Sequence, residues 1–113
     1  MSFNVEATED FRKAFKKLAK RYRSFASDFK EFTKSLEENP YQGDELTPGV
    51  RKIRMAITSK GKGKSGGARV ITYTVAVSKE SGDVYLIDIY DKSDYDTVDV
   101  SVLKKMIAEL GIL

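Results

Sequence analysis

The sequence lacks two of the residue types that catalysis and metal binding use most often. Its 113 residues contain no cysteine and no histidine. Without cysteine there are no disulfide bonds, thiolate nucleophiles or cysteine metal sites, and without histidine the commonest general base and metal ligand is missing. We therefore expect no metal and no cofactor. Any catalysis must come from lysine, arginine, tyrosine, serine or carboxylate side chains.

Long apolar runs are also missing. No stretch approaches the roughly 20 apolar residues that span a bilayer, and the first ten residues do not have the pattern of a secretory signal. We expect a cytoplasmic protein with no membrane partner. A composition of 41% hydrophobic and 33% charged residues, with only two prolines, is typical of globular proteins. The length predicts a single domain over residues 1–113.

Acidic residues are absent from the middle of the chain. Residues 50–79 contain eight lysines and arginines and no aspartate or glutamate, whereas residues 80–113 contain three basic and eight acidic residues. The net charge of +3 hides this asymmetry. An acid-free basic segment inside a folded domain indicates a surface for phosphates or for an acidic partner.

The first third of the chain has the apolar spacing of helices. After a short strand at residues 2–7, Thr8 is the expected helix N-cap, and one apolar stripe then recurs every three or four residues. Because Ser24 and Ser27 interrupt the run, we favour two helices folded as a hairpin over one long helix or a coiled-coil dimer. The stripe consists of Phe11, Phe15, Leu18, Tyr22, Phe25, Phe29, Phe32 and Leu36.

The remainder changes to the two-residue period of strands. Residues 50–58, 68–77 and 84–90 are expected to form three antiparallel strands, and Asp99 or Ser101 to cap a C-terminal helix that Gly111 closes. The predicted class is α+β, with an N-terminal strand and a helical hairpin packed on a small antiparallel sheet, and a C-terminal helix.

Basic residues from neighbouring strands are the strongest candidates for a site. Lys52 and Arg54 lie two residues apart on one strand, so both face away from the apolar set Ile53, Met55 and Ile57 that must meet the helices. Arg69 begins the next strand and Lys92 follows the third. Cations of three strands can therefore converge on one open side of the sheet.

The glycine-rich loop between the first two of these strands resembles a phosphate-binding P-loop only at its end. Gly63-Lys64-Ser65 matches the last part of that motif. However, Thr58 stands where the first glycine is required, and the segment after the loop is predicted to be a strand rather than a helix. Nucleotide triphosphate binding is therefore not expected.

The runs VRKIRMAITSKGKGKSGGARVITYTV and VYLIDIYDKSD, with NPYQGDEL before them, closely resemble the RelE/HigB-like toxins of bacterial toxin–antitoxin pairs. The resemblance covers nearly the whole chain. It implies the RelE-like fold, a cognate antitoxin partner, and a ribosome-dependent endoribonuclease that cleaves mRNA without a metal. In this reaction the RNA 2'-hydroxyl attacks the adjacent phosphate.

The resemblance also implies roles for individual residues. Lys52 and Arg54 match the paired basic residues of the family and Arg69 its next arginine, so that Arg54 or Arg69 would hold the phosphate and Lys52 is a candidate proton acceptor. Lys92 stands where several members carry arginine, and either Tyr90 or Tyr95 would supply the acid. The expected catalytic residues are Lys52, Arg54, Arg69, Lys92 and Tyr95, and the expected RNA-binding residues are Arg51, Lys60, Lys62 and Lys64.

Two other functions are compatible with this pattern. A ParE-like toxin shares the fold but poisons DNA gyrase and needs no nuclease residues; the presence of Lys52, Arg54 and Arg69 together argues against it. The second alternative is a non-catalytic module that binds RNA or the ribosome and uses its cations only to neutralise phosphates.

Overall fold

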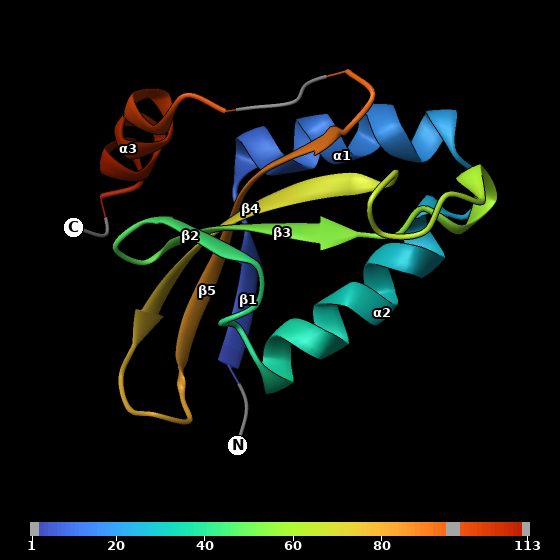
Figure 1. Cartoon of the computed structure of the whole chain (residues 1–113). Helices are drawn as coiled ribbons and strands as arrows, with labels where there is room; N and C mark the ends of the chain where they lie inside the picture. Colours follow the sequence, from blue (N-terminus) through green and yellow to red (C-terminus); the bar gives the residue numbers. More distant parts are fainter. Residues whose placement is uncertain (1–2, 95–97, 112–113) are drawn as a thin grey trace.

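The chain forms a five-stranded sheet with helices on both faces (Figure 1). The computed structural model describes residues 3–94 and 98–111. The expected order of a strand, two helices, a run of strands and a C-terminal helix is confirmed. The elements are β1 (Phe3–Ala7), α1 (Glu9–Arg21), α2 (Phe25–Glu38), β2 (Asp44–Thr47), β3 (Val50–Met55), the 3-10 helix η1 (Thr58–Lys60), β4 (Ala68–Ala76), β5 (Gly82–Asp91) and α3 (Val100–Glu109).

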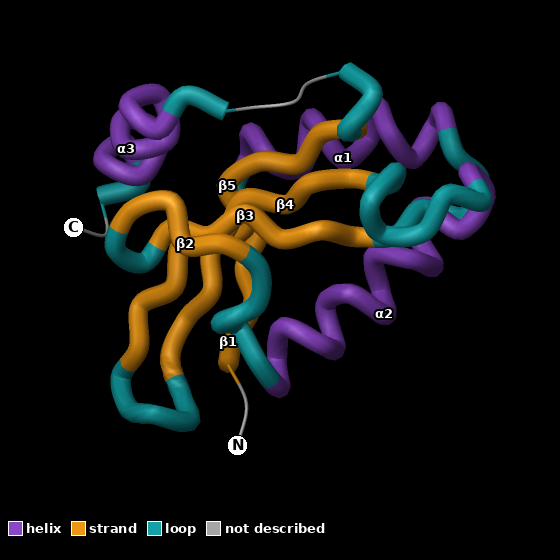
Figure 2. Tube along the Cα trace, in the orientation of Figure 1, coloured by secondary structure: helices purple, strands orange, loops and turns teal. Residues whose placement is uncertain are grey.

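The strands, drawn in orange in Figure 2, form a sheet with the order β1-β5-β4-β3-β2. This sheet is mixed rather than wholly antiparallel. The pairs β2–β3, β3–β4 and β4–β5 are antiparallel, as expected for β3, β4 and β5. However, β1 pairs with β5 in parallel. The sequence did not predict β2, because Gly43, Pro48 and Gly49 mark the surrounding segment as a loop.

The helical region is two helices, as favoured from the sequence. Thr8 caps α1 by accepting a hydrogen bond from the Phe11 amide at 3.2 Å. Tyr22, which follows α1, has an extended backbone, and Ser24 precedes α2. The Ser24 hydroxyl does not cap the helix amides but hydrogen-bonds to the side chains of Asp28 and Ser59. No helix in residues 3–94 and 98–111 is long and apolar enough to cross a membrane.

The larger core lies between α1, α2 and one face of the sheet. All eight residues of the predicted apolar stripe belong to it, and Phe25 and Leu36 are completely buried. From the sheet, Ile53 and Met55 of β3 pack against this stripe, together with Ile57 just beyond the strand. The face of β3 that meets the helices is therefore the one that strand alternation predicts.

A smaller core on the opposite face corrects the expectation that this side is open. Here α3 contributes Leu103 and Ile107, which pack with Val50, Ile71 and Ile87 of the sheet. Tyr90, considered as an acid from the sequence, is also buried in this cluster, with an exposed fraction of 5%. The remaining uncovered part of this face is where the basic residues gather.

The larger core sets the stability of the fold. We expect Phe25→Ala to lower the free energy of unfolding by about 3 to 5 kcal/mol, because the removed ring leaves a cavity in a fully buried position. The matched control is Val77→Ala, whose side chain is 78% exposed and whose loss should change stability by less than about 0.5 kcal/mol. Urea denaturation followed by circular dichroism measures both. Equal stability of the two variants would contradict the assigned packing.

Candidate functional site

The two predicted basic residues of β3 meet the predicted arginine of β4 on one face of the sheet. Arg54 lies directly opposite Arg69 in the antiparallel pair, and Lys52 lies opposite Ile71. Alternation along β4 places Arg69 and Ile71 on the same side as Lys52 and Arg54. The three cations therefore share a face, as the sequence predicts.

These residues line a surface pocket of about 280 Å³. We call it the basic pocket; its lining residues are Asp44, Lys52, Arg54, Ser65, Arg69 and Lys92. Four of the five residues expected to be catalytic thus come together, from β3, β4 and the turn after β5. The fifth, Tyr95, lies outside the described residues.

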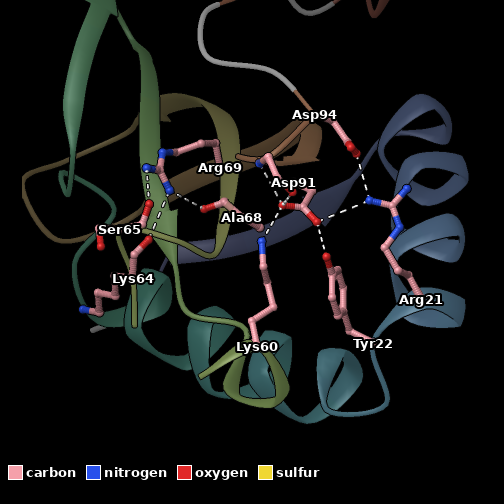
Figure 3. Close-up of polar contacts among 10 residues, drawn as sticks. Arg21, Tyr22, Lys60, Lys64, Ser65, Ala68, Arg69, Asp91 and Asp94 are labelled. Atoms are coloured by element: carbon pink, nitrogen blue, oxygen red, sulfur yellow. Dashed lines mark hydrogen bonds and ion pairs between the residues drawn. The ribbon is translucent and has the colours of Figure 1, made fainter. Parts of the chain in front are cut away.

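Arg69 is held in place by the glycine-rich loop (Figure 3). Its guanidinium donates hydrogen bonds to the backbone carbonyls of Lys64 at 3.1 Å, Ser65 at 2.9 Å and Ala68 at 3.2 Å. Only 7% of the residue is exposed. These carbonyls fix the direction of a cation that already lies beside Arg54, so Arg69 supplies a preorganised positive charge to the wall of the pocket.

The glycine-rich loop can approach β3 closely because Gly67 has no side chain. A Cβ added at this position would lie 2.1 Å from the Met55 carbonyl oxygen, a distance that no real contact permits. Gly61 and Gly63 adopt left-handed conformations, with φ of 69° and 65°. The loop leads into β4 and not into a helix, which agrees with the rejection of a P-loop.

Lys60 is held by a buried carboxylate, and its assignment as an RNA-binding residue stays a prediction. Its ammonium group forms an ion pair with the buried Asp91 carboxylate at 2.8 Å, and only 11% of its side chain is exposed (Figure 3). It also lies 5.6 Å from the centre of the Tyr22 ring. The partner of Lys60 is 31 residues away in sequence, so no local pattern reveals the pair.

Asp91 joins the end of β5 to α1 and η1. Besides Lys60, its carboxylate accepts hydrogen bonds from Arg21 at 3.3 Å, from the Tyr22 hydroxyl, and from the Ser93 amide and hydroxyl at 3.0 and 2.6 Å. Complete burial opposes ionisation and raises the pKa. The hydrogen bonds of Lys60, Ser93 and Tyr22 outweigh this effect and hold the pKa of Asp91 well below its ordinary value.

A second carboxylate anchors the other side of η1. Asp28 of α2 accepts hydrogen bonds from the Thr58 hydroxyl and from the Thr58 amide and Ser24 hydroxyl, the last two at 2.8 Å. Burial again raises the pKa of Asp28, but these bonds lower it further than burial raises it. Asp28 and Asp91 together fix η1, and with it the start of the glycine-rich loop.

The other three predicted RNA-binding residues have different environments. Arg51 shares strand parity with Ile53 and points away from the basic pocket, toward the carbonyls of Gln42 and Gly43, each at 3.4 Å, so it does not line that pocket. Lys62 and Lys64 are exposed on the loop. Lys64 and Arg54 both line a neighbouring pocket of about 370 Å³ between α2 and β3.

Asp44 and Ser65 were not predicted as site residues. Asp44 begins β2 and lies opposite Lys52 in the sheet, and Ser65 belongs to the glycine-rich loop. The only sequence signal for Asp44 was its place after Gly43, within the NPYQGDEL run. In residues 3–94 and 98–111, no group of three or more acidic side chains is arranged to hold a metal ion.

Comparison with models of known protein families gives no match for this sequence. The resemblance that its residues carry is therefore a prediction, and the geometry of the basic pocket is the observation on which a functional interpretation must rest.

The buried Asp91 network should give the protein a characteristic acid sensitivity. Asp91→Asn leaves Lys60 without its anion, so we expect the free energy of unfolding at pH 7 to fall by about 3 kcal/mol. Because the pKa of Asp91 is lower in the folded state, its stabilisation is full above about pH 4 and is lost as the pH falls toward the folded value. The difference between wild type and variant should therefore shrink as the pH falls from 7 to 3.

Urea denaturation at each pH measures this difference. The matched control is Asp94→Asn, because Asp94 contacts Arg21 at 2.9 Å but its side chain is 43% exposed. Its effect at pH 7 should be much smaller, because an exposed ion pair contributes little to stability. If the difference in free energy of unfolding between wild type and Asp91→Asn stays constant or increases at low pH, the assigned network is contradicted.

Proposed function

We propose that the chain is a metal-independent endoribonuclease, the toxin of a type II toxin–antitoxin pair, and that it cleaves mRNA on the ribosome in the cytoplasm. The single observation that supports the activity is the convergence of Lys52, Arg54, Arg69 and Lys92 on one pocket. The resemblance to RelE/HigB-like toxins supports the choice of mRNA and ribosome.

The arrangement suits the needs of RNA self-cleavage. When a 2'-hydroxyl attacks the neighbouring phosphate, negative charge grows on the phosphorane oxygens, and cations already placed around that position stabilise the transition state more than the ground state. Arg54 is exposed and can form two parallel hydrogen bonds to phosphate oxygens. Arg69 adds a fixed charge beside it, and Lys52 and Lys92 add two further charges to the pocket lining.

The exposed lysines of the glycine-rich loop extend the positive surface beyond the pocket. Lys62 and Lys64 can neutralise phosphates on either side of the cleaved bond without contacting it. Such contacts increase affinity for any RNA sequence and position the strand. Sequence or codon preference must then come from other contacts, including those of the ribosome.

A cognate antitoxin is the proposed protein partner. A polypeptide with an acidic or amphipathic segment would cover the basic pocket and keep RNA out by charge complementarity. Co-expression with the product of the neighbouring gene, followed by purification through a tag on the toxin, tests this. Recovery of a complex that no longer cleaves RNA is the expected result.

Removal of a pocket cation should abolish toxicity without unfolding the protein. We expect Arg54→Ala to slow RNA cleavage by about 100-fold or more, because one charge that stabilises the phosphorane is lost. Lys52→Ala should also weaken cleavage strongly and reduce the slope of RNA affinity against salt by about one. Arg12→Ala and Lys79→Ala are the matched controls, since both residues are exposed and neither lines the basic pocket.

The readouts are growth of a bacterium after induction, mapped mRNA ends, and cleavage by the purified protein with ribosomes carrying mRNA. Growth arrest with cleavage at codons supports the nuclease. Arrest with gyrase-linked DNA breaks would instead indicate a ParE-like poison, and normal growth a binding module. Equal arrest by wild type and the Lys52/Arg54 double variant, at matched protein levels, would overturn the proposed site.

A further inference from the structure

The basic pocket contains one carboxylate, and it lies where a proton acceptor is needed. We propose that Asp44 is the general base that takes the proton from the attacking RNA 2'-hydroxyl. The proposal rests on the nuclease function of the pocket. It assigns to Asp44 the role that the resemblance implies for Lys52.

The backbone fixes Asp44 beside Lys52. The two residues are direct partners in the antiparallel pair of β2 and β3, so their side chains leave the sheet on the same face. Gly43 makes this approach possible. Its φ is +72°, and a Cβ there would lie 2.2 Å from the Lys52 carbonyl oxygen, so a larger residue would push β2 away from β3.

The turn that follows also restrains this short strand. The Gly49 amide donates to the Glu45 carboxylate at 3.2 Å, and the Gly49 carbonyl accepts from the Thr74 amide at 2.9 Å. The β2–β3 hairpin is thereby tied to its own turn and to β4. Asp44 is exposed but begins a strand whose position is set from both ends.

Asp44 differs from the structural aspartates in having open oxygens. Within the described residues its carboxylate forms no hydrogen bond and no ion pair shorter than 4.0 Å, whereas Asp28, Asp91, Asp94 and Asp99 are all engaged. Its carboxylate is thus held near four cations without being neutralised by direct contact with one of them.

Among the charged side chains that line the pocket, Asp44 is the one suited to accept a proton. The ammonium and guanidinium groups of Lys52, Arg54, Arg69 and Lys92 donate hydrogen bonds and cannot accept a proton while charged. An ionised carboxylate can accept the proton of the 2'-hydroxyl as the 2' oxygen bonds to phosphorus. The charged groups that line the pocket with Asp44 are Lys52 and Arg54 of β3, Arg69 of β4, and Lys92 of the turn after β5.

The step balances without a metal or co-reactant. The 2'-hydroxyl proton moves to the Asp44 carboxylate while the 2' oxygen forms a bond to phosphorus. The bond between phosphorus and the 5' oxygen then breaks, and the 5' oxygen takes a proton from water. The products are a 2',3'-cyclic phosphate and a 5'-hydroxyl end, and Asp44 returns its proton to solvent.

The test separates proton transfer from RNA binding. Wild type and Asp44→Asn are compared in single-turnover cleavage of mRNA on bacterial ribosomes, and in binding of an RNA with a 2'-deoxyribose at the cleaved position. We expect Asp44→Asn to cleave at least about 100-fold more slowly while it binds the uncleavable RNA as tightly as wild type or more tightly.

Two further variants keep the result interpretable. Asp44→Glu retains a carboxylate and should recover part of the rate, and Glu80→Gln removes one exposed charge outside the basic pocket and should behave as wild type. Unchanged or faster cleavage by Asp44→Asn would overturn the proposal and leave Asp44 as a residue that only limits RNA affinity. Failure of wild type to cleave, or full activity of Arg54→Ala, would instead overturn the nuclease function itself.

Discussion

The buried Asp91 carboxylate is the interaction on which the geometry of the site depends. It collects hydrogen bonds from α1 through Arg21 and Tyr22, from η1 through Lys60, and from its own turn through Ser93. A buried charge is costly unless it is fully paired, so these segments cannot separate without a large loss of stability. Because the glycine-rich loop starts at η1 and Lys92 follows Asp91 directly, the same carboxylate sets two walls of the basic pocket.

The basic pocket itself is held together against electrostatic repulsion. Like charges directly opposite each other in a sheet are destabilising, and Arg54 faces Arg69 in this way. Three backbone carbonyls partly offset the charge of Arg69. An anion that binds between the two arginines would reduce this repulsion further. The fold thus maintains an electrostatic repulsion that a bound phosphate would relieve. Functional sites commonly lower the stability of a protein in this way.

Local sequence patterns predicted the elements whose residues form regular periods. The apolar stripe from Phe11 to Leu36 and the alternation around Ile53 were sufficient to place two helices on one face and Lys52 on the other. The same alternation excludes Arg51 from the pocket, since it shares parity with Ile53. The short strand β2 was not predictable, because its pairing depends on the close approach at Gly43 rather than on any period of its own. Because β2 was not predicted, Asp44 could not be placed beside Lys52 from the sequence.

The environment of Lys60 shows why composition alone does not distinguish the lysines of the basic segment. In an acid-free segment every lysine has the same local context, and only the folded chain brings the Asp91 carboxylate to one of them. The segment therefore divides its charges between two tasks. Lys60 and Arg69 are largely buried and fix the loop, while Arg54, Lys62 and Lys64 remain exposed.

This division bears on the proposed nuclease activity, which would use neither histidine nor a metal. Exposed lysines and arginines on a flexible loop would bind phosphate but reorganise as charge develops, so they would stabilise substrate and transition state alike. The Arg69 guanidinium is instead held by three backbone carbonyls, in a pocket that also contains the Asp44 carboxylate, and it needs little reorganisation. In the proposed nuclease, the buried ion pair of Lys60 would therefore contribute to catalysis without contacting RNA, because it holds the loop that orients Arg69.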